Sequence, residues 1–272
     1  MNSHKKLLTG PYLSWAAAFI LIPLAMMFYY GLTGEDGGFT LSNLLAIGTR
    51  ENFKALGLSL ILSIISTAVC LILAYPLAMI LVNMNVSQSG FIVLIFILPM
   101  WMNFLLRTLA WQTLLEKTGV INSILAFLHL PSLNIINTPA AIVLGMVYNF
   151  LPFMVLPIYN VLVKIDPNVV NAARDLGANG LQTFLRVTFP LSLPGVISGI
   201  TMVFVPALTT FVISNLLGGS KILLIGNVIE QEFTQASNWH LGSGLSIVLM
   251  IFIILNMIIT SVFDKEGEGQ TL

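Results

Sequence analysis

Six long apolar stretches dominate this chain and leave few choices for its fold. Five of them carry no charged side chain, and one contains Arg107. An α-helix rises about 1.5 Å per residue, so a stretch of about 20 residues crosses the roughly 30 Å hydrocarbon core of a membrane. The stretches are residues 12–32, 56–82, 91–115, 139–163, 195–217 and 241–263. They predict six transmembrane spans.

The composition and the chemistry of the backbone favour the same fold class. Only 8% of the residues are charged and 57% are hydrophobic, whereas about 25% of the residues of a water-soluble domain are charged. Backbone groups in lipid must find hydrogen bonds within the protein, and the alternating pattern of a barrel strand is absent, so the spans are predicted to be helices. We expect an all-α integral membrane protein with a single transmembrane domain over residues 1–272.

Two features of the chain argue against a cleaved signal peptide and against a disulfide or a cysteine metal site. Residues 12–32 follow Lys5 and Lys6, as in a secretory signal, but the stretch lacks a small-residue cleavage pattern at its end, so we expect it to be retained. Cys70 is the single cysteine. Neither a disulfide nor a cysteine metal site is therefore possible within one chain.

The distribution of lysine and arginine predicts the orientation in the membrane. Six spans place both termini on one side. With the termini inside, the cytoplasmic residues are Lys5, Lys6, Lys164, Arg174, Arg186 and Lys265, and the outer residues are Arg50, Lys54, Lys117 and Lys221. Because cytoplasmic loops carry the excess of positive charge, we expect both termini in the cytoplasm.

A polar segment, residues 164–194, separates the fourth and fifth stretches on the cytoplasmic side. Asp166 is predicted to cap a short helix, and Pro167 suits the first helical position because its missing N–H has no intrahelical partner there. Gly177 can adopt the left-handed conformation that ends a helix. This pattern predicts a rigid knob that faces a soluble partner.

A second short helix is predicted from about Leu181. Phe184, Leu185 and Val187 form its apolar stripe. We expect Pro190 and Pro194 to prevent the helix from continuing, because each lacks a backbone N–H and its ring clashes with the preceding turn.

The spacing of these residues resembles the signature loop of ABC importer permeases. The consensus of that loop is Glu-Ala-Ala, a glycine, nine residues and Ile-x-Leu-Pro. The matching positions here are Asn171, Ala172, Ala173, Asp175, Gly177, Val187, Phe189 and Pro190. In this family the loop forms coupling helices that dock into a cleft on a cytoplasmic ATPase. Asn171 replaces the usual glutamate, which removes a possible salt bridge to the ATPase.

Further motifs are similar to those of the spermidine/putrescine branch of the same family, the PotB type. They lie at residues 74–78, 99–103, 106–107, 144–148, 151–159, 218–221 and 224–227. The resemblance therefore extends over most of the chain. It implies a permease with six transmembrane helices, with coupling helices between spans 4 and 5, that imports polyamine across the plasma membrane of a prokaryote.

The resemblance also implies a set of partners. They are a second similar permease, a dimer of ATP-binding subunits at the cytoplasmic face, an extracytoplasmic polyamine-binding protein and membrane lipid, with no nucleic acid. This chain contains no G-x-x-x-x-G-K-[ST] run to bind phosphate. ATP and Mg²⁺ are therefore expected in the partner ATPase, and no cofactor is expected here.

A polyamine carries three or four positive charges, and each bare charge in hydrocarbon costs about several kcal/mol. Tyrosine and tryptophan faces hold cations for roughly 0.5–2 kcal/mol each, and amide oxygens accept hydrogen bonds from them. The candidate path residues are Trp101, Asn103, Tyr148, Asn149, Tyr159, Thr209, Thr210 and Asn215. Each has a structural alternative, because polar residues in spans often bond a neighbouring helix.

The charged residues near the outer surface have two interpretations each. We expect Arg107 to snorkel to the outer surface, with Glu116 as one candidate partner. Glu230 and Glu232 could attract cations or contact the binding protein, or they could form a solvated face.

Catalysis by this chain is not expected. His4, His129 and His240 lie outside the stretches or at their edges, and no stretch contains Asp or Glu. An intramembrane aspartyl or zinc hydrolase therefore lacks its catalytic groups and its metal ligands.

Four functions remain open. The first is the polyamine importer permease, and the second is a related ABC permease for another small solute. The third is a stand-alone secondary transporter or channel, which predicts intramembrane carboxylates for ion coupling. The fourth is a membrane scaffold that transports nothing.

Overall fold

The structure, a computed structural model, describes residues 11–84, 98, 100–219 and 221–268. In chain order its helices are η1 Ala17–Leu21, α2 Ile22–Leu32, α3 Ser42–Leu45, η2 Ala46–Gly48, α4 Arg50–Asn83, α6 Phe104–Leu115, α7 Val120–Phe127, α8 Pro139–Leu162, α9 Pro167–Asp175, α10 Gly180–Thr183, η4 Phe184–Thr188, α11 Phe189–Thr209, α12 Val212–Leu217, α13 Ile225–Thr234 and α14 Trp239–Glu268. The described residues form no β-sheet; their β-pairing is the isolated bridge between Thr33 and Phe39.

Five helical segments are long and apolar enough to cross a membrane. They are Pro11–Leu32, Arg50–Asn83, Pro139–Leu162, Gly180–Thr209 and Trp239–Thr260. They cover five of the six predicted stretches and confirm the all-helical membrane fold. The protein is a multi-pass membrane protein.

The third predicted span begins outside the described residues, which omit 85–97 and 99. In its described part, residues 91–115 do not form one unbroken helix. Asn103 leaves the helical conformation and caps α6, since its Oδ1 accepts hydrogen bonds from the N–H groups of Leu105 at 2.9 Å and Leu106 at 3.2 Å. The count of six spans remains a prediction.

The fifth span differs from its predicted bounds of 195–217 at both ends. Helix is continuous through α10, η4 and α11, and it stops at Thr210, so α12 is a separate short helix. The expected stop at Pro190 and Pro194 is therefore wrong. The wider π-helical turn η4, in which the N–H of Phe189 bonds to the carbonyl of Phe184, directly precedes Pro190, and Pro194 lies inside α11.

The chain divides into two compact units. The first unit combines residues 1–55 with 228–252. Within it, polar side chains satisfy the carbonyl groups at the end of α2. The Nδ2 of Asn43 donates to the carbonyl of Thr33 at 2.9 Å, and the Nδ1 of His240 donates to the same carbonyl at 2.6 Å. His240, predicted as a loop residue, thus fastens the start of α14 to the end of α2.

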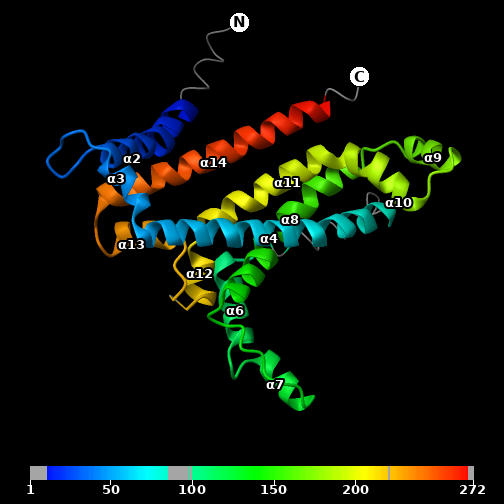
Figure 1. The fold of residues 1–272 in the computed structure, drawn as a ribbon, viewed down its shortest axis with the longest axis horizontal. Helices are drawn as coiled ribbons and strands as arrows, with labels where there is room; N and C mark the ends of the chain where they lie inside the picture. The colour runs from blue at the N-terminus through cyan, green and yellow to red at the C-terminus, as the bar shows by residue number, and fades with distance from the viewer. Residues whose placement is uncertain (1–10, 85–97, 99, 220, 269–272) are drawn as a thin grey trace, which may run out of the picture. The chain divides into compact units, whose positions relative to one another are not determined.

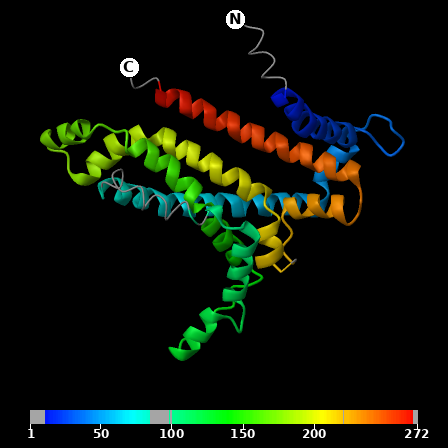
Figure 2. The same ribbon diagram turned by 180° about the vertical axis from the view of Figure 1, so that it is seen from behind.

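The second unit combines residues 56–227 with 253–272. Its core is the packing of α8 against α11, which run side by side in Figures 1 and 2. The two helices approach closely because Gly195 and Gly199, four residues apart on α11, face α8. A Cβ atom at Gly195 would lie 2.8 Å from the carbonyl oxygen of Pro157, and one at Gly199 would lie 2.7 Å from the Sδ of Met154. Small residues at this spacing are typical of tightly packed transmembrane helices.

We predict that Gly195→Val lowers the stability of the protein by about 1–3 kcal/mol, because the added side chain forces α11 away from α8. Thermal unfolding in detergent measures the effect. Gly57→Val is the matched control, since a Cβ atom at Gly57 on α4 meets nothing within 4 Å. Equal melting temperatures for the two variants would contradict the close approach of α8 and α11.

Candidate functional site

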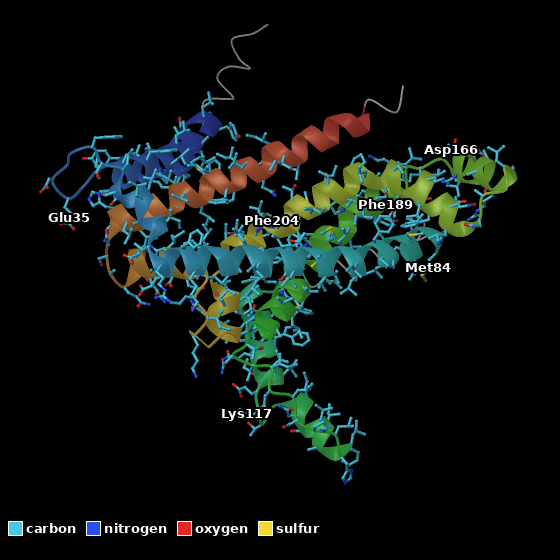
Figure 3. All side chains as sticks on the ribbon, viewed as in Figure 1. Glu35, Met84, Lys117, Asp166, Phe189 and Phe204 are labelled. Carbon is cyan, nitrogen blue, oxygen red and sulfur yellow. The ribbon has the colours of Figure 1, made fainter. Side chains whose placement is uncertain are left out.

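The 164–194 segment begins with the predicted helix, α9. The carboxylate of Asp166 accepts a hydrogen bond from the N–H of Asn168 at 2.9 Å, and Pro167 occupies the first turn. These contacts satisfy the start of the helix as the sequence predicts. Figures 2 and 3 show α9, with Asp166 at its start, beyond the ends of α8 and α11.

The elbow after α9 is a Schellman turn. Gly177 has a φ of +88°, which confirms the predicted left-handed conformation. Its N–H donates to the carbonyl of Arg174 at 2.9 Å, and the N–H of Ala178 donates to the carbonyl of Ala173 at 3.1 Å. Both bonds satisfy carbonyl groups that the end of the helix would leave free.

A capping box then starts α10 directly after the elbow. The Oδ1 of Asn179 accepts from the N–H of Gln182 at 2.9 Å, and the Oε1 of Gln182 accepts from the N–H of Asn179 at 3.0 Å. The sequence analysis missed this feature, although the Asn-x-x-Gln spacing signals it. Hydrogen bonds at both sides of the elbow thus define the angle between α9 and α10.

The surface of the segment is apolar where it projects from the membrane helices. Leu176, next to the elbow, is 90% exposed, and Val169, Leu181 and Leu185 are exposed as well. Exposed leucines in an otherwise polar segment are typical of a surface that another protein covers. The sequence analysis did not single out Leu176, because its exposure depends on where the helix ends.

The signature residues fall into two groups. Asn171, Ala172, Asp175, Gly177 and Pro190 are exposed, whereas Ala173, Val187 and Phe189 are half-buried. Of the first group, Ala172, Asp175 and Gly177 lie on α9 or its elbow, whereas Pro190 lies in the first turn of α11. Among the second group, the ring of Phe189 contacts that of Tyr75 on α4, with ring centroids 5.8 Å apart.

A cavity of about 320 Å³ separates α9 from the membrane helices. The α9 side of the cavity consists of Pro167, Val170, Asn171 and Arg174, and the side chains opposite include Met79 and Val82 of α4 and Leu162 of α8. Figure 3 shows Met84, one residue beyond α4, at the same end of the second unit as Asp166. Open space therefore lies between these residues of α9 and the ends of α4 and α8.

An open cleft of about 660 Å³ lies among α4, α6 and α8. Tyr148 lines it, and its ring meets that of Trp111 edge to face with centroids 5.2 Å apart. The remaining side chains around the cleft are aliphatic, such as Leu62 and Val143, and the described residues that line it include no carboxylate. The structure thus places Tyr148, a predicted path residue, at a cleft, and the same cleft is lined by Trp111, which the sequence analysis did not name.

Asn149, next to Tyr148, points to a different environment. Its side chain is 1% exposed, and its Nδ2 donates to the carbonyl of Gly145 at 2.9 Å. Its Oδ1 has no hydrogen-bond donor among the described residues.

The remaining path candidates are dispersed. Trp101 is 77% exposed, Asn103 caps α6, and Tyr159 is buried. The hydroxyl of Thr209 donates to the carbonyl of Val205 at 3.1 Å, and Thr210 ends α11. The structure does not bring these residues together with Tyr148.

Asn215 belongs to a buried polar cluster centred on Asn227. The Nδ2 of Asn227 donates to the Oδ1 of Asn215 at 2.7 Å and to the carbonyl of Phe211 at 3.1 Å. Its Oδ1 accepts from the hydroxyl of Ser214 at 2.5 Å and from the N–H of Leu224 at 3.0 Å. These bonds satisfy the backbone where α11 breaks and α12 begins, which favours the structural interpretation of Asn215.

Arg107 is 7% exposed, so the prediction that it snorkels to the outer surface is wrong. The packing of α6 against α8, α12 and α7 keeps this residue inside the fold.

Glu230 and Glu232 are half-exposed on α13, and the Oε1 of Glu230 accepts from the hydroxyl of Thr234 at 3.0 Å. Among the described residues, no group of three or more His, Cys, Asp and Glu side chains could hold a metal ion.

The fold is that of the permease subunits of ABC importers. A bacterial ABC transporter that imports the acidic polysaccharide alginate contains a chain that superposes with a TM-score of 0.73 over 99% of this chain and 97% of that one, at 16% identity. An alginate transporter crystallised with its pentasaccharide-bound periplasmic protein gives a TM-score of 0.75 over 94% and 91% of the two chains, at 15% identity. These likenesses establish the fold alone.

The sequence comparison establishes the family. Residues 38–265 match the family described as "Binding-protein-dependent transport system inner membrane component", and the chain belongs to this family. It is 36% identical to the spermidine/putrescine transport system permease protein PotB of Haemophilus influenzae, over 93% of this chain and 92% of that protein. It is 37% identical to the PotB protein of Escherichia coli K12, over 90% and 92% of the two chains.

We predict that Asn227→Ala lowers the stability by about 2–4 kcal/mol, because it removes four hydrogen bonds and leaves the buried N–H of Leu224 without its acceptor. Asn215→Ala removes a single acceptor and should cost about 1 kcal/mol. The double variant should resemble Asn227→Ala, since both single changes remove the same bond. Thermal unfolding measures all three. Loss of uptake by Asn215→Ala at an unchanged melting temperature would instead identify Asn215 as a contact of the transported solute.

Proposed function

We propose that this chain is the permease subunit of an ABC importer that moves polyamine into the cytoplasm and takes its energy from ATP hydrolysis in a partner subunit. The observation that carries the coupling role is the projecting surface of the 164–194 segment, with its hydrogen-bonded elbow and the exposed Leu176. The polyamine cargo is supported by the identity to PotB proteins over about nine-tenths of the chain.

The geometry of the segment suits the transmission of force. A surface that receives a push from another protein must keep its shape, and the Schellman turn and the capping box fix the elbow. Ala172 on the exposed face allows a partner backbone to approach closely, and Leu176 can fill a pocket of the partner. Closure of an ATPase dimer against this surface would shift the helices between outward and inward access.

The proposed complex contains a second permease of this family, two ATP-binding subunits that hold ATP and Mg²⁺, and an extracytoplasmic polyamine-binding protein. The 164–194 segment and both termini lie in the cytoplasm of a prokaryotic cell, in line with the lysine and arginine distribution. Catalysis then resides in the ATPase and not in this chain.

The cleft at Tyr148 and Trp111 is the part of this chain that we propose for the solute path. Its aromatic faces can hold an ammonium group by cation–π attraction, whereas its aliphatic walls offer no anionic partner. A polyamine with several charges needs further oxygen acceptors, which we assign to the second permease. Another small solute, carried by a related ABC importer, remains the alternative cargo.

The coupling role predicts that Gly177→Val abolishes uptake by the complete complex without preventing membrane insertion. At a φ of +88°, a β-branched residue strains the elbow and changes the angle between α9 and α10. Gly180→Val is the matched control, because Gly180 lacks a positive φ and an added Cβ atom there meets nothing within 4 Å. Full uptake by Gly177→Val would refute the coupling role.

The cargo assignment predicts uptake of labelled spermidine into vesicles that hold the complete complex, in the presence of ATP and the binding protein. Excess unlabelled putrescine should compete, whereas sulfate, ferric iron and an amino acid should not. Failure of spermidine to enter, with ATP hydrolysis intact, would reject the polyamine cargo and leave the coupling role standing.

A further inference from the structure

A buried hydrogen bond joins α4 to α11 near the 164–194 segment. The hydroxyl oxygens of Tyr75 and Ser192 lie 2.6 Å apart, and both residues are buried. The hydroxyl of Ser192 lies 2.9 Å from the carbonyl oxygen of Phe189 and donates its proton there. Because Ser192 has one hydroxyl proton, Tyr75 is the donor between the two helices.

The ring of Tyr75 belongs to a cluster of three aromatic rings. The ring of Tyr75 meets that of Phe184 edge to face at a centroid distance of 5.4 Å and that of Phe189 at 5.8 Å, while Phe184 and Phe189 are 6.0 Å apart. Phe184 begins the π-helical turn η4, and Phe189 begins α11. Tyr75 therefore contacts the chain at both ends of the turn that connects α10 to the fifth span.

The close contact at Tyr75 contrasts with the open space beneath α9. The cavity of about 320 Å³ lies between α9 and the ends of α4 and α8. Helix α9 also packs against α10 and η4, and Thr188 at the end of η4 lines the same cavity. A displacement of α9 is therefore transmitted better through α10 and η4 than directly to the ends of the spans, and it reaches α4 at Tyr75.

We infer that Tyr75 is a positioning residue that couples the 164–194 segment to α4, through its hydroxyl bond to Ser192 and its ring contacts with Phe184 and Phe189. The inference rests on the proposed coupling role. It assigns two separate outputs to the segment: the covalent continuation into α11, and the side-chain contact with α4. Without the hydroxyl bond, α11 would move with the segment while α4 lagged behind.

The chemistry of the site distinguishes this role from packing. A phenylalanine at position 75 would fill the same space among the rings, so the hydroxyl adds a directed bond and little volume. The bond holds α4 and α11 in one register, because breaking it would leave buried polar groups without a hydrogen-bond partner, which costs free energy. Contacts among the three rings alone would still allow α4 to slide along α11.

The test uses Tyr75→Phe in the complete transporter reconstituted in vesicles, with labelled spermidine as the transported probe. The measured quantity is the amount of spermidine taken up per ATP hydrolysed. We expect it to fall about fivefold, which corresponds to ~1 kcal/mol of lost coupling, while ATP hydrolysis stimulated by the binding protein persists. Ser192→Ala should give the same loss, and the double variant should lose no more than either single variant.

Ser63→Ala is the matched control, since it removes a buried hydroxyl that donates to the carbonyl of Ser59 within α4 itself, at 2.6 Å. An unchanged uptake per ATP in Tyr75→Phe would overturn the inference. A parallel loss of uptake, ATP hydrolysis and melting temperature would overturn it as well, because that pattern marks a purely structural residue. Two further measurements in the same vesicles test the proposed function separately. They are spermidine uptake by the wild-type transporter and the loss of that uptake in Gly177→Val.

Discussion

The need to satisfy every backbone hydrogen bond inside a membrane governs this structure. Long helices meet that need over most of their length, so the chain can bend or stop only where other groups replace the missing bonds. Asn103 does so at the start of α6, Asn227 at the break after α11, and Asn43 with His240 at the end of α2. These asparagines and His240 thus replace backbone hydrogen bonds where helices begin or end, whereas buried hydroxyls such as those of Ser59 and Ser63 lie inside α4.

This constraint explains which parts of the fold the sequence could predict. Apolar stretches report where helices can lie in lipid, and local signals such as Asp166, Pro167 and Gly177 report where a helix starts and stops in water. The break at Thr210 escaped prediction because its capping residue, Asn227, is 16 positions from Phe211 and hydropathy does not detect it. The effect of Pro190 and Pro194 was also misjudged, because the helix continues past both, with the π-helical turn η4 directly before Pro190.

The candidate site was predictable to a smaller extent, since exposure and direction depend on packing. Tyr148 and Asn149 are adjacent in sequence, yet Tyr148 lines a cleft, whereas Asn149 is buried and its Oδ1 has no hydrogen-bond donor among the described residues. Asn215 looked equally suited to a solute but serves the end of a helix. Residue type and depth in a span therefore identify polar residues as candidate solute contacts. The hydrogen-bond partners of each side chain are needed to distinguish a solute contact from a helix cap.

A transporter of this class needs stiffness in one place and freedom in another. The elbow between α9 and α10 is stiff because hydrogen bonds satisfy both of its sides, whereas the cavity under α9 allows the helix to move relative to the ends of the spans. A segment packed tightly against every span would resist displacement, and one packed against none would move without effect. In the proposed coupling, the close contact of Tyr75 with Phe184, Phe189 and Ser192 makes α4 move together with α11 when the surface of the segment is displaced.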